Sequence, residues 1–208
     1  MTYQIRINSS SQVYRVETEE ALTKGQNILV SVDQILESAV VLCQKCPKHD
    51  SATLPEAVFM RVLTVEDQAL KTKLKEKAKV YIDQVQAKAA RHNLDIKIID
   101  TDLSFDEKKL TIHFSAENRV DFRSLVSDVM GNFRKIIRMQ QVGPREEAKL
   151  MGGVGRCGQE ICCHRFLKDT EAVAAEMASM QEFSSKTVAK MTGCCGRAMC
   201  CLLYEAKQ

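Results

Sequence analysis

Apolar and polar residues alternate in short runs near the N-terminus, which is the spacing of half-buried strands. The runs cover residues 5–7, 13–16, 28–32 and 40–42, and polar turns separate them, most clearly at residues 24–27. Several short strands of this kind predict a small β-barrel-like domain over residues 1–58. Its expected role is structural.

The spacing then changes to that of a helix. Thr64 and Asp67 give an approximate capping signal, apolar residues recur at helical intervals from Leu70 to Ala89, and Asn93 is a suitable stop. We therefore expect one long helix at the start of a middle domain that spans residues 59–143.

Alternation returns after this helix. Residues 96–98 and 103–105 read as strand, residues 106–108 as a turn, and residues 110–114 as the returning strand of a hairpin. Asp121 is expected to cap a second helix with an apolar stripe as far as Phe133, and a last strand starts near Ile137. The order α-β-β-α-β predicts an α+β domain with helices on one face of a sheet. His113 falls opposite the apolar face of its strand, so we expect it at the surface.

Residues 144–208 form the third predicted region, a helical, cysteine-rich tail. Pro144 suits a first helical turn, which residues 145–150 can continue. Another helix is expected to begin at Gly196. Between these two helices we expect a linking helix, which contains Ala172, Ala175, Met177, Ala178 and Met180.

Composition narrows the choice of function. The chain has 208 residues, a net charge of +3 and no tryptophan, which gives no case for a basic or base-stacking nucleic-acid surface. Its beginning lacks the layout of a signal peptide, and no run approaches the roughly 18 apolar residues of a membrane span. We therefore expect a cytoplasmic protein with reduced thiols.

Seven of the nine cysteines lie in the tail, and six of them form an internal repeat. Cys157-Gly158-x3-Cys162-Cys163-x2-Phe166 recurs 38 residues later as Cys195-Gly196-x3-Cys200-Cys201-x2-Tyr204. Clustered thiols in a reducing compartment indicate metal binding or catalysis more often than disulfides. Zinc usually takes paired C-x2-C ligands, a spacing that is absent here, whereas an iron–sulfur cluster tolerates more varied spacing.

Neighbouring side chains diverge, so both members of a doublet seldom reach one metal. Cys157, Cys195 and one cysteine of each doublet therefore make a plausible set of four, and Cys162, Cys163, Cys200 and Cys201 all remain candidates. Shared ligation with another subunit is the other arrangement. Cys194, which the first copy lacks, is expected to be a packed thiol.

Other signals near these thiols are weaker. Arg156, Arg165 and Arg197 would stabilise an anionic cluster or be ordinary surface charge. The glycines at 153, 155 and 158 match a dinucleotide fingerprint but follow a helix instead of a strand, so that interpretation is rejected. Cys43-x2-Cys46 is a lone pair, a weak sign of a zinc half-site or a redox pair.

At the segments GPREEAKLMGGVGRCGQEICC and MTGCCGRAMCCLLYE the chain closely resembles the YaaT/RicT family, whose members carry the polymerase-suppressor C-terminal domain. The resemblance extends upstream to residue 92. It implies a cytoplasmic regulatory subunit that is not an enzyme and that assembles with two small helical proteins. It also implies a [4Fe-4S] cluster and control of mRNA processing by an RNase Y-like endoribonuclease, with effects on sporulation and biofilm formation.

Two features depart from the family pattern. Ile136 and Gln140 stand where relatives are expected to have basic residues, which argues against carrying over an RNA contact to this strand. Cys194 is additional. The alternatives to the cluster are a zinc-stabilised interaction module and a thiol redox protein, for which His164 is the only weak candidate base.

Overall fold

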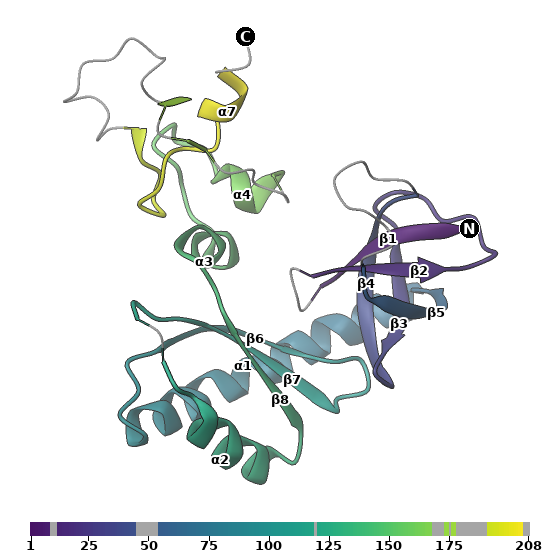
Figure 1. Ribbon diagram of the computed structural model, residues 1–208, viewed down its shortest axis with the longest axis horizontal. Helices are drawn as coiled ribbons and strands as arrows, with labels where there is room; N and C mark the ends of the chain where they lie inside the picture. The colour runs from purple at the N-terminus through teal and green to yellow at the C-terminus, as the bar shows by residue number, and fades with distance from the viewer. Residues whose placement is uncertain are drawn as a thin grey trace. The chain divides into compact units, whose positions relative to one another are not determined.

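The computed structural model describes residues 1–8, 12–44, 54–118, 120–167, 173–174, 176–177 and 191–205 (Figure 1). The chain forms two compact units. The first unit consists of residues 1–113 and 118–140, and the second of residues 114–117 and 141–208. Cys46 of the predicted pair lies outside the described residues, as do Ala172, Ala175, Ala178 and Met180 of the predicted linking helix.

The first unit begins with a closed five-stranded barrel, which confirms the expected β-barrel-like fold. The strand order is β1-β2-β5-β3-β4, and β4 pairs with β1 to close it. Only the β2–β5 pair is parallel. Sequence reasoning missed β5, which crosses the predicted division at residue 58; the three-domain division itself stays a prediction. The strands are β1 (Thr2–Ile7), β2 (Val13–Glu17), β3 (Asn27–Val32), β4 (Ile35–Cys43) and β5 (Glu56–Val62).

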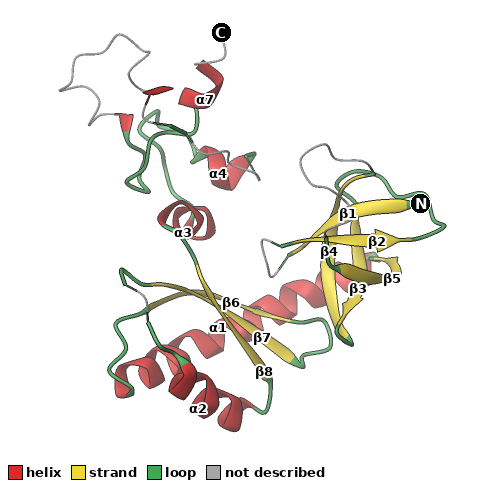
Figure 2. Ribbon diagram, in the orientation of Figure 1, coloured by secondary structure: helices red, strands yellow, loops and turns green. Residues whose placement is uncertain are grey.

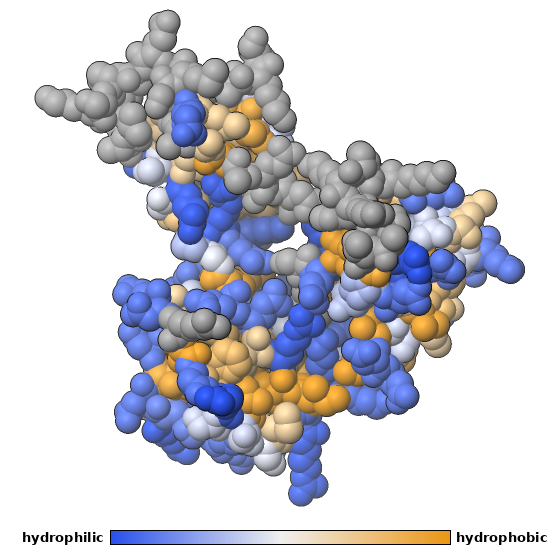
Figure 3. Space-filling view, in the orientation of Figure 1, coloured by the Kyte–Doolittle hydropathy of each residue, from blue (hydrophilic) through white to orange (hydrophobic). Residues whose placement is uncertain are grey.

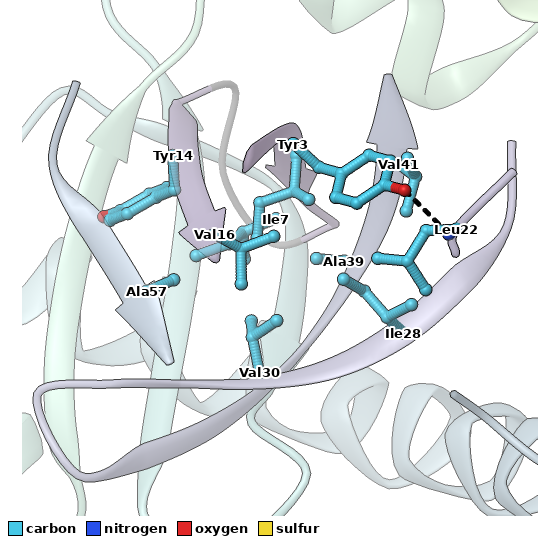
Figure 4. Close-up of a cluster of buried hydrophobic side chains, with 11 residues drawn as sticks. Tyr3, Ile7, Tyr14, Val16, Leu22, Ile28, Val30, Ala39, Val41 and Ala57 are labelled. Atoms are coloured by element: carbon cyan, nitrogen blue, oxygen red, sulfur yellow. Dashed lines mark hydrogen bonds between the residues drawn. The ribbon is translucent and has the colours of Figure 1, made fainter. Parts of the chain in front are cut away.

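Inward-facing aliphatic side chains fill the barrel (Figure 4). Ile5, Val16, Ile28 and Val30 are fully buried, and each such side chain stabilises the fold by about 1.5–3 kcal/mol. Tyr3 is also buried, and its hydroxyl accepts a 3.1 Å hydrogen bond from the backbone N–H of Leu22. Period-two alternation therefore sorts these strands into an inner and an outer face.

The long helix α1 (Val65–Arg91) starts and stops where the sequence predicts. Thr64 and Asp67 form a reciprocal capping box. The Arg61 guanidinium and the Thr64 backbone N–H hold the pKa of the Asp67 carboxyl well below its usual range. At the other end Asn93 takes a φ of 53°, and the N–H of Leu94 bonds to the carbonyl oxygen of Ala89 at 3.0 Å.

A three-stranded sheet of order β6-β7-β8 follows, and with its helices it confirms the α+β class. The strands are β6 (Lys97–Leu103), β7 (Lys109–Ser115) and β8 (Ile136–Gln141), and α2 (Arg123–Phe133) connects β7 to β8. The N–H of Ile136 donates to the carbonyl oxygen of Lys108, and the N–H of Val142 donates to that of Phe114. The two bonded pairs have the same separation along the chain, so β7 and β8 run parallel. A parallel pair needs such a crossover helix.

His113 on β7 is buried, only 5% exposed, so the expected surface position was wrong. Its Nε2 lies 3.3 Å from Oδ2 of Asp102 on β6. The face of β7 that carries His113 is itself buried, since Thr111 on the same face is 1% exposed. Alternation alone could not indicate that both faces of this strand are covered.

Lys109 also lies on β7, and its ammonium is 3.0 Å from Oε1 of Glu37 on β4. The Glu37 side chain is buried, at 4% exposure, and that of Lys109 is largely buried, at 13%. The backbone N–H of Phe105 bonds to the carbonyl oxygen of Leu36 at 2.8 Å next to this pair. The first unit therefore has a buried ion pair that joins the barrel to the sheet.

No helix among the described residues is long and apolar enough to cross a membrane. The visible face of the molecule is largely hydrophilic (Figure 3). Apolar side chains gather on it beside α2 and β8, where Met130 and Ile136 are 43% and 52% exposed.

Candidate metal centre

The second unit contains short helices joined by long loops (Figure 2). Its described helices are α3 (Pro144–Met151), α4 (Cys162–Arg165) and α7 (Leu202–Glu205). As predicted, α3 has Pro144 in its first turn, and it ends at Gly152, whose φ is 74°. The six repeated cysteines lie between the end of α3 and the start of α7.

Each copy of the cysteine repeat folds into the same small hairpin. We call residues 153–161 the first cysteine hairpin and residues 191–199 the second. Val154 bridges Glu160 in the first, and Thr192 bridges Ala198 in the second.

The backbone hydrogen bonds of the two hairpins match at every step. Gly155 N–H donates to Gln159 at 2.7 Å, and Gly193 N–H donates to Arg197 at 2.8 Å. The bonds Gly158–Gly155 and Gly196–Gly193 are both 3.0 Å long. At the base, Ile161 N–H donates to Gly153 and Met199 N–H to Met191, at 3.0 and 2.9 Å. The sequence repeat is therefore also a structural repeat.

Glycine is needed at two places in each hairpin. Gly158 and Gly196 have φ values of 76° and 70°, the left-handed conformation that closes a three-residue hairpin loop. A Cβ added at Gly155 would lie 3.5 Å from Sγ of Cys157, and one at Gly193 would lie 3.6 Å from Sγ of Cys195. The thiols of Cys157 and Cys195 therefore lie beside equivalent glycines, in the same position of each hairpin. Whether either thiol is a metal ligand stays a prediction.

Each doublet comes directly after its hairpin. Cys162 and Cys163 open α4, whereas Cys200 and Cys201 precede α7, which begins only at Leu202. The helix expected from Gly196 was therefore wrong, because residues 196–198 belong to the second cysteine hairpin. The matched aromatics Phe166 and Tyr204 are 62% and 52% exposed.

The two hairpins lie close enough for their thiols to interact electrostatically. Burial raises the pKa of the Cys163 thiol, and the thiols of Cys200, Cys195 and Cys194 raise it further. Burial also raises the pKa of the Cys200 thiol, and Cys195 and Cys162 act in the same direction. The 38-residue spacing thus brings thiols from both copies into one region.

Burial divides these cysteines. Cys163 is buried, Cys157 is exposed, and Cys162, Cys195, Cys200 and Cys201 are intermediate. Cys194 is exposed, so the expectation of a packed thiol was wrong: its place on the outside of the hairpin loop keeps it from the interior. Among the described residues, no three His, Cys, Asp or Glu side chains are close enough together to hold a metal ion. The ligand set stays a prediction.

Residues 57–142 match the PSP1 C-terminal conserved region, and residues 172–208 match the third domain of PSP1-like proteins. The chain is 38% identical to the stage 0 sporulation protein YaaT of Bacillus subtilis over 178 residues, which is 86% of this chain and 64% of that protein. The chain belongs to the YaaT/RicT family.

An uncharacterized protein of Schizosaccharomyces pombe is 29% identical over 85 residues, 41% of this chain and 11% of that protein. No solved structure matches the chain. The chain spans about two thirds of YaaT, 64% of its length. Within the family region, the match to the third domain contains the second cysteine hairpin, and the first hairpin lies between the two matched regions.

The predicted arginines Arg156, Arg165 and Arg197 are all exposed, and their role beside a cluster stays a prediction. Sequence reasoning missed Arg145 on α3, whose Nη2 donates a 2.9 Å hydrogen bond to the carbonyl oxygen of Ala198. One feature of the sequence could have drawn attention to Arg145. It is a basic residue in the first turn of a helix, where the helix dipole favours acidic residues.

Replacing Gly158 with alanine should weaken the first cysteine hairpin by about 1–2 kcal/mol, because an L-residue is strained at a φ of 76°. Amide exchange at Gly155 and Ile161 should then become about tenfold faster or more. Gly131→Ala, in α2 with nothing within 4 Å of an added Cβ, should leave these rates unchanged. Equal rates in both variants would contradict the strain argument.

Proposed function

We propose that this protein is a non-enzymatic regulatory adaptor whose two cysteine hairpins together hold a [4Fe-4S] cluster. The observation that carries the proposal is the structural repeat: two hairpins with the same hydrogen bonds present equivalent thiols, and thiols of both copies interact. Membership of the family of a sporulation protein supports the regulatory role. Six cysteines are candidate ligands: Cys157, Cys162, Cys163, Cys195, Cys200 and Cys201.

The available ligand atoms, all of them cysteine sulfurs, are of the type that an iron–sulfur cluster binds. Iron–sulfur clusters take four thiolates, and the two hairpins together with the doublets that follow them offer seven thiols. Burial disfavours the thiolate of Cys163, so a positive metal would have to compensate for its deprotonation. We propose that binding draws thiols of the two copies together. The cluster would supply a redox-sensitive and iron-sensitive tie between them.

The adaptor role extends this proposal to partners. With the hairpins tied together, the second unit would present an ordered surface to two small helical proteins. The complex would direct an RNase Y-like endoribonuclease in the cytoplasm, and oxidation or iron loss would release the tie. The resemblance to the family supports this assignment.

The geometry of His164 favours a binding role over thiol catalysis. Its Nδ1 donates to the carbonyl oxygen of Lys149 at 2.7 Å, and its Nε2 lies 3.5 Å from Oε1 of Glu160. Both ring nitrogens thus face oxygen atoms, whereas a general base must reach the thiol it activates. Zinc remains the second candidate, because it also binds four thiolates.

Anaerobic purification of the full chain, followed by assays of iron, acid-labile sulfide and zinc, tests the proposal. Iron and sulfide in equal amounts, lost in air, are the expected result. Colourless protein with zinc that survives air would reject the cluster in favour of the zinc-stabilised module. Protein without either metal would reject both. Co-purification with the two small helical proteins tests the adaptor role separately.

A further inference from the structure

Helix α3 makes contact with the second cysteine hairpin near its N-terminal end. Arg145 Nη2 donates to the carbonyl oxygen of Ala198 at 2.9 Å, although the two residues are 53 positions apart. Ala198 is the residue that bridges Thr192, so the guanidinium binds at the base of this hairpin. The Arg145 side chain is only partly exposed, which strengthens a charge-assisted hydrogen bond.

The C-terminal end of α3 contacts the first copy of the repeat through His164 on α4. His164, which follows the first doublet, donates from Nδ1 to the carbonyl oxygen of Lys149 at 2.7 Å. Its ring also packs on Gly152, where an added Cβ would lie 3.6 Å from Cε1. One short helix thus contacts both copies of the repeat.

We propose that α3 is a bracket between the two copies of the repeat, and that Arg145 is the positioning residue that fixes the second cysteine hairpin. The positioning role is a property of the metal-free chain. Its effect on metal binding rests on the proposed function.

The positioning role is tested by amide exchange in the metal-free full chain. Arg145→Met should accelerate exchange at Gly193 and Met199 by about tenfold or more, the loss expected for one charge-assisted hydrogen bond, and should leave Gly155 and Ile161 unchanged. His164→Leu should do the reverse. Arg197→Met, which removes the same charge from the exposed side of the second hairpin, should change neither set. Unchanged rates in Arg145→Met would overturn the proposal.

The effect on metal binding is tested by metal affinity in the full chain. Arg145→Met should lower affinity by about 10–100-fold, the range for groups just outside a ligand shell, and Arg145→Lys should recover most of it. Equal affinity in Arg145→Met and Arg197→Met would overturn this effect. If the wild-type chain held no metal, the proposed function would fail while amide exchange still decided the positioning role.

Discussion

Cys157→Ser should remove most of the bound metal from the full chain while the barrel and sheet stay folded. Cys157 lies over Gly155 as Cys195 lies over Gly193, so its loss leaves one hairpin without its loop thiolate. Loss of a direct ligand should lower metal affinity by more than about 100-fold, since loss of outer partners alone lowers it by about 10–100-fold. Iron, sulfide and zinc per chain after anaerobic purification measure the change.

Cys194→Ser is the matched control. Cys194 is exposed in the same kind of loop and has no counterpart in the first cysteine hairpin, so its replacement should leave the metal content unchanged. A thiol redox enzyme that used the Cys162–Cys163 doublet would keep its turnover in Cys157→Ser. Full metal in Cys157→Ser together with depleted metal in Cys194→Ser would contradict the repeat as the source of ligands.

Lys109→Met should lower the free energy of unfolding by about 3–5 kcal/mol, because it removes the ammonium that pairs with the buried Glu37 carboxylate. The Glu37 side chain is only 4% exposed, so water reaches it poorly. Urea unfolding followed by circular dichroism at neutral pH measures the change.

Two further variants test whether burial makes the Lys109–Glu37 pair contribute more to stability than an exposed ion pair does. Lys77 is 2.8 Å from Glu107, but the two side chains are 61% and 41% exposed, so Lys77→Met should change stability by less than about 1 kcal/mol. The double variant Lys109→Met/Glu37→Leu should recover much of the loss, since an apolar pair can replace a buried ion pair. Similar losses in Lys77→Met and Lys109→Met would show that burial does not govern these pairs.

Sequence reasoning worked best where a signal and its structural partner are close in the chain. Thr64 and Asp67 are three residues apart, and their reciprocal hydrogen bonds are local to the first turn of α1. The same holds for the end of α1 at Asn93. The cysteine repeat was readable for a related reason, because a fixed offset is visible without knowledge of the fold.

The errors arose where a distant partner decided the outcome. His113 is buried because other parts of the fold cover both faces of β7, including the face that it shares with the buried Thr111. β5 is barrel strand because β2 and β3 hydrogen-bond to it on its two sides. The hairpins were missed because glycine-rich cysteine loops have no apolar alternation, although Gly158 and Gly196 stand at the left-handed position of a three-residue loop.

By itself the sequence determined the α+β class, the limits of α1 and α3, the duplicated cysteine segments and the family, all of which depend on local spacing or on direct likeness. Only the tertiary structure decided that the two copies approach each other, that Cys163 is buried and Cys194 exposed, and that Arg145 reaches the second cysteine hairpin. The physical reason is that burial and electrostatic interaction depend on distances in space, and local spacing does not fix the distance between residues 53 positions apart.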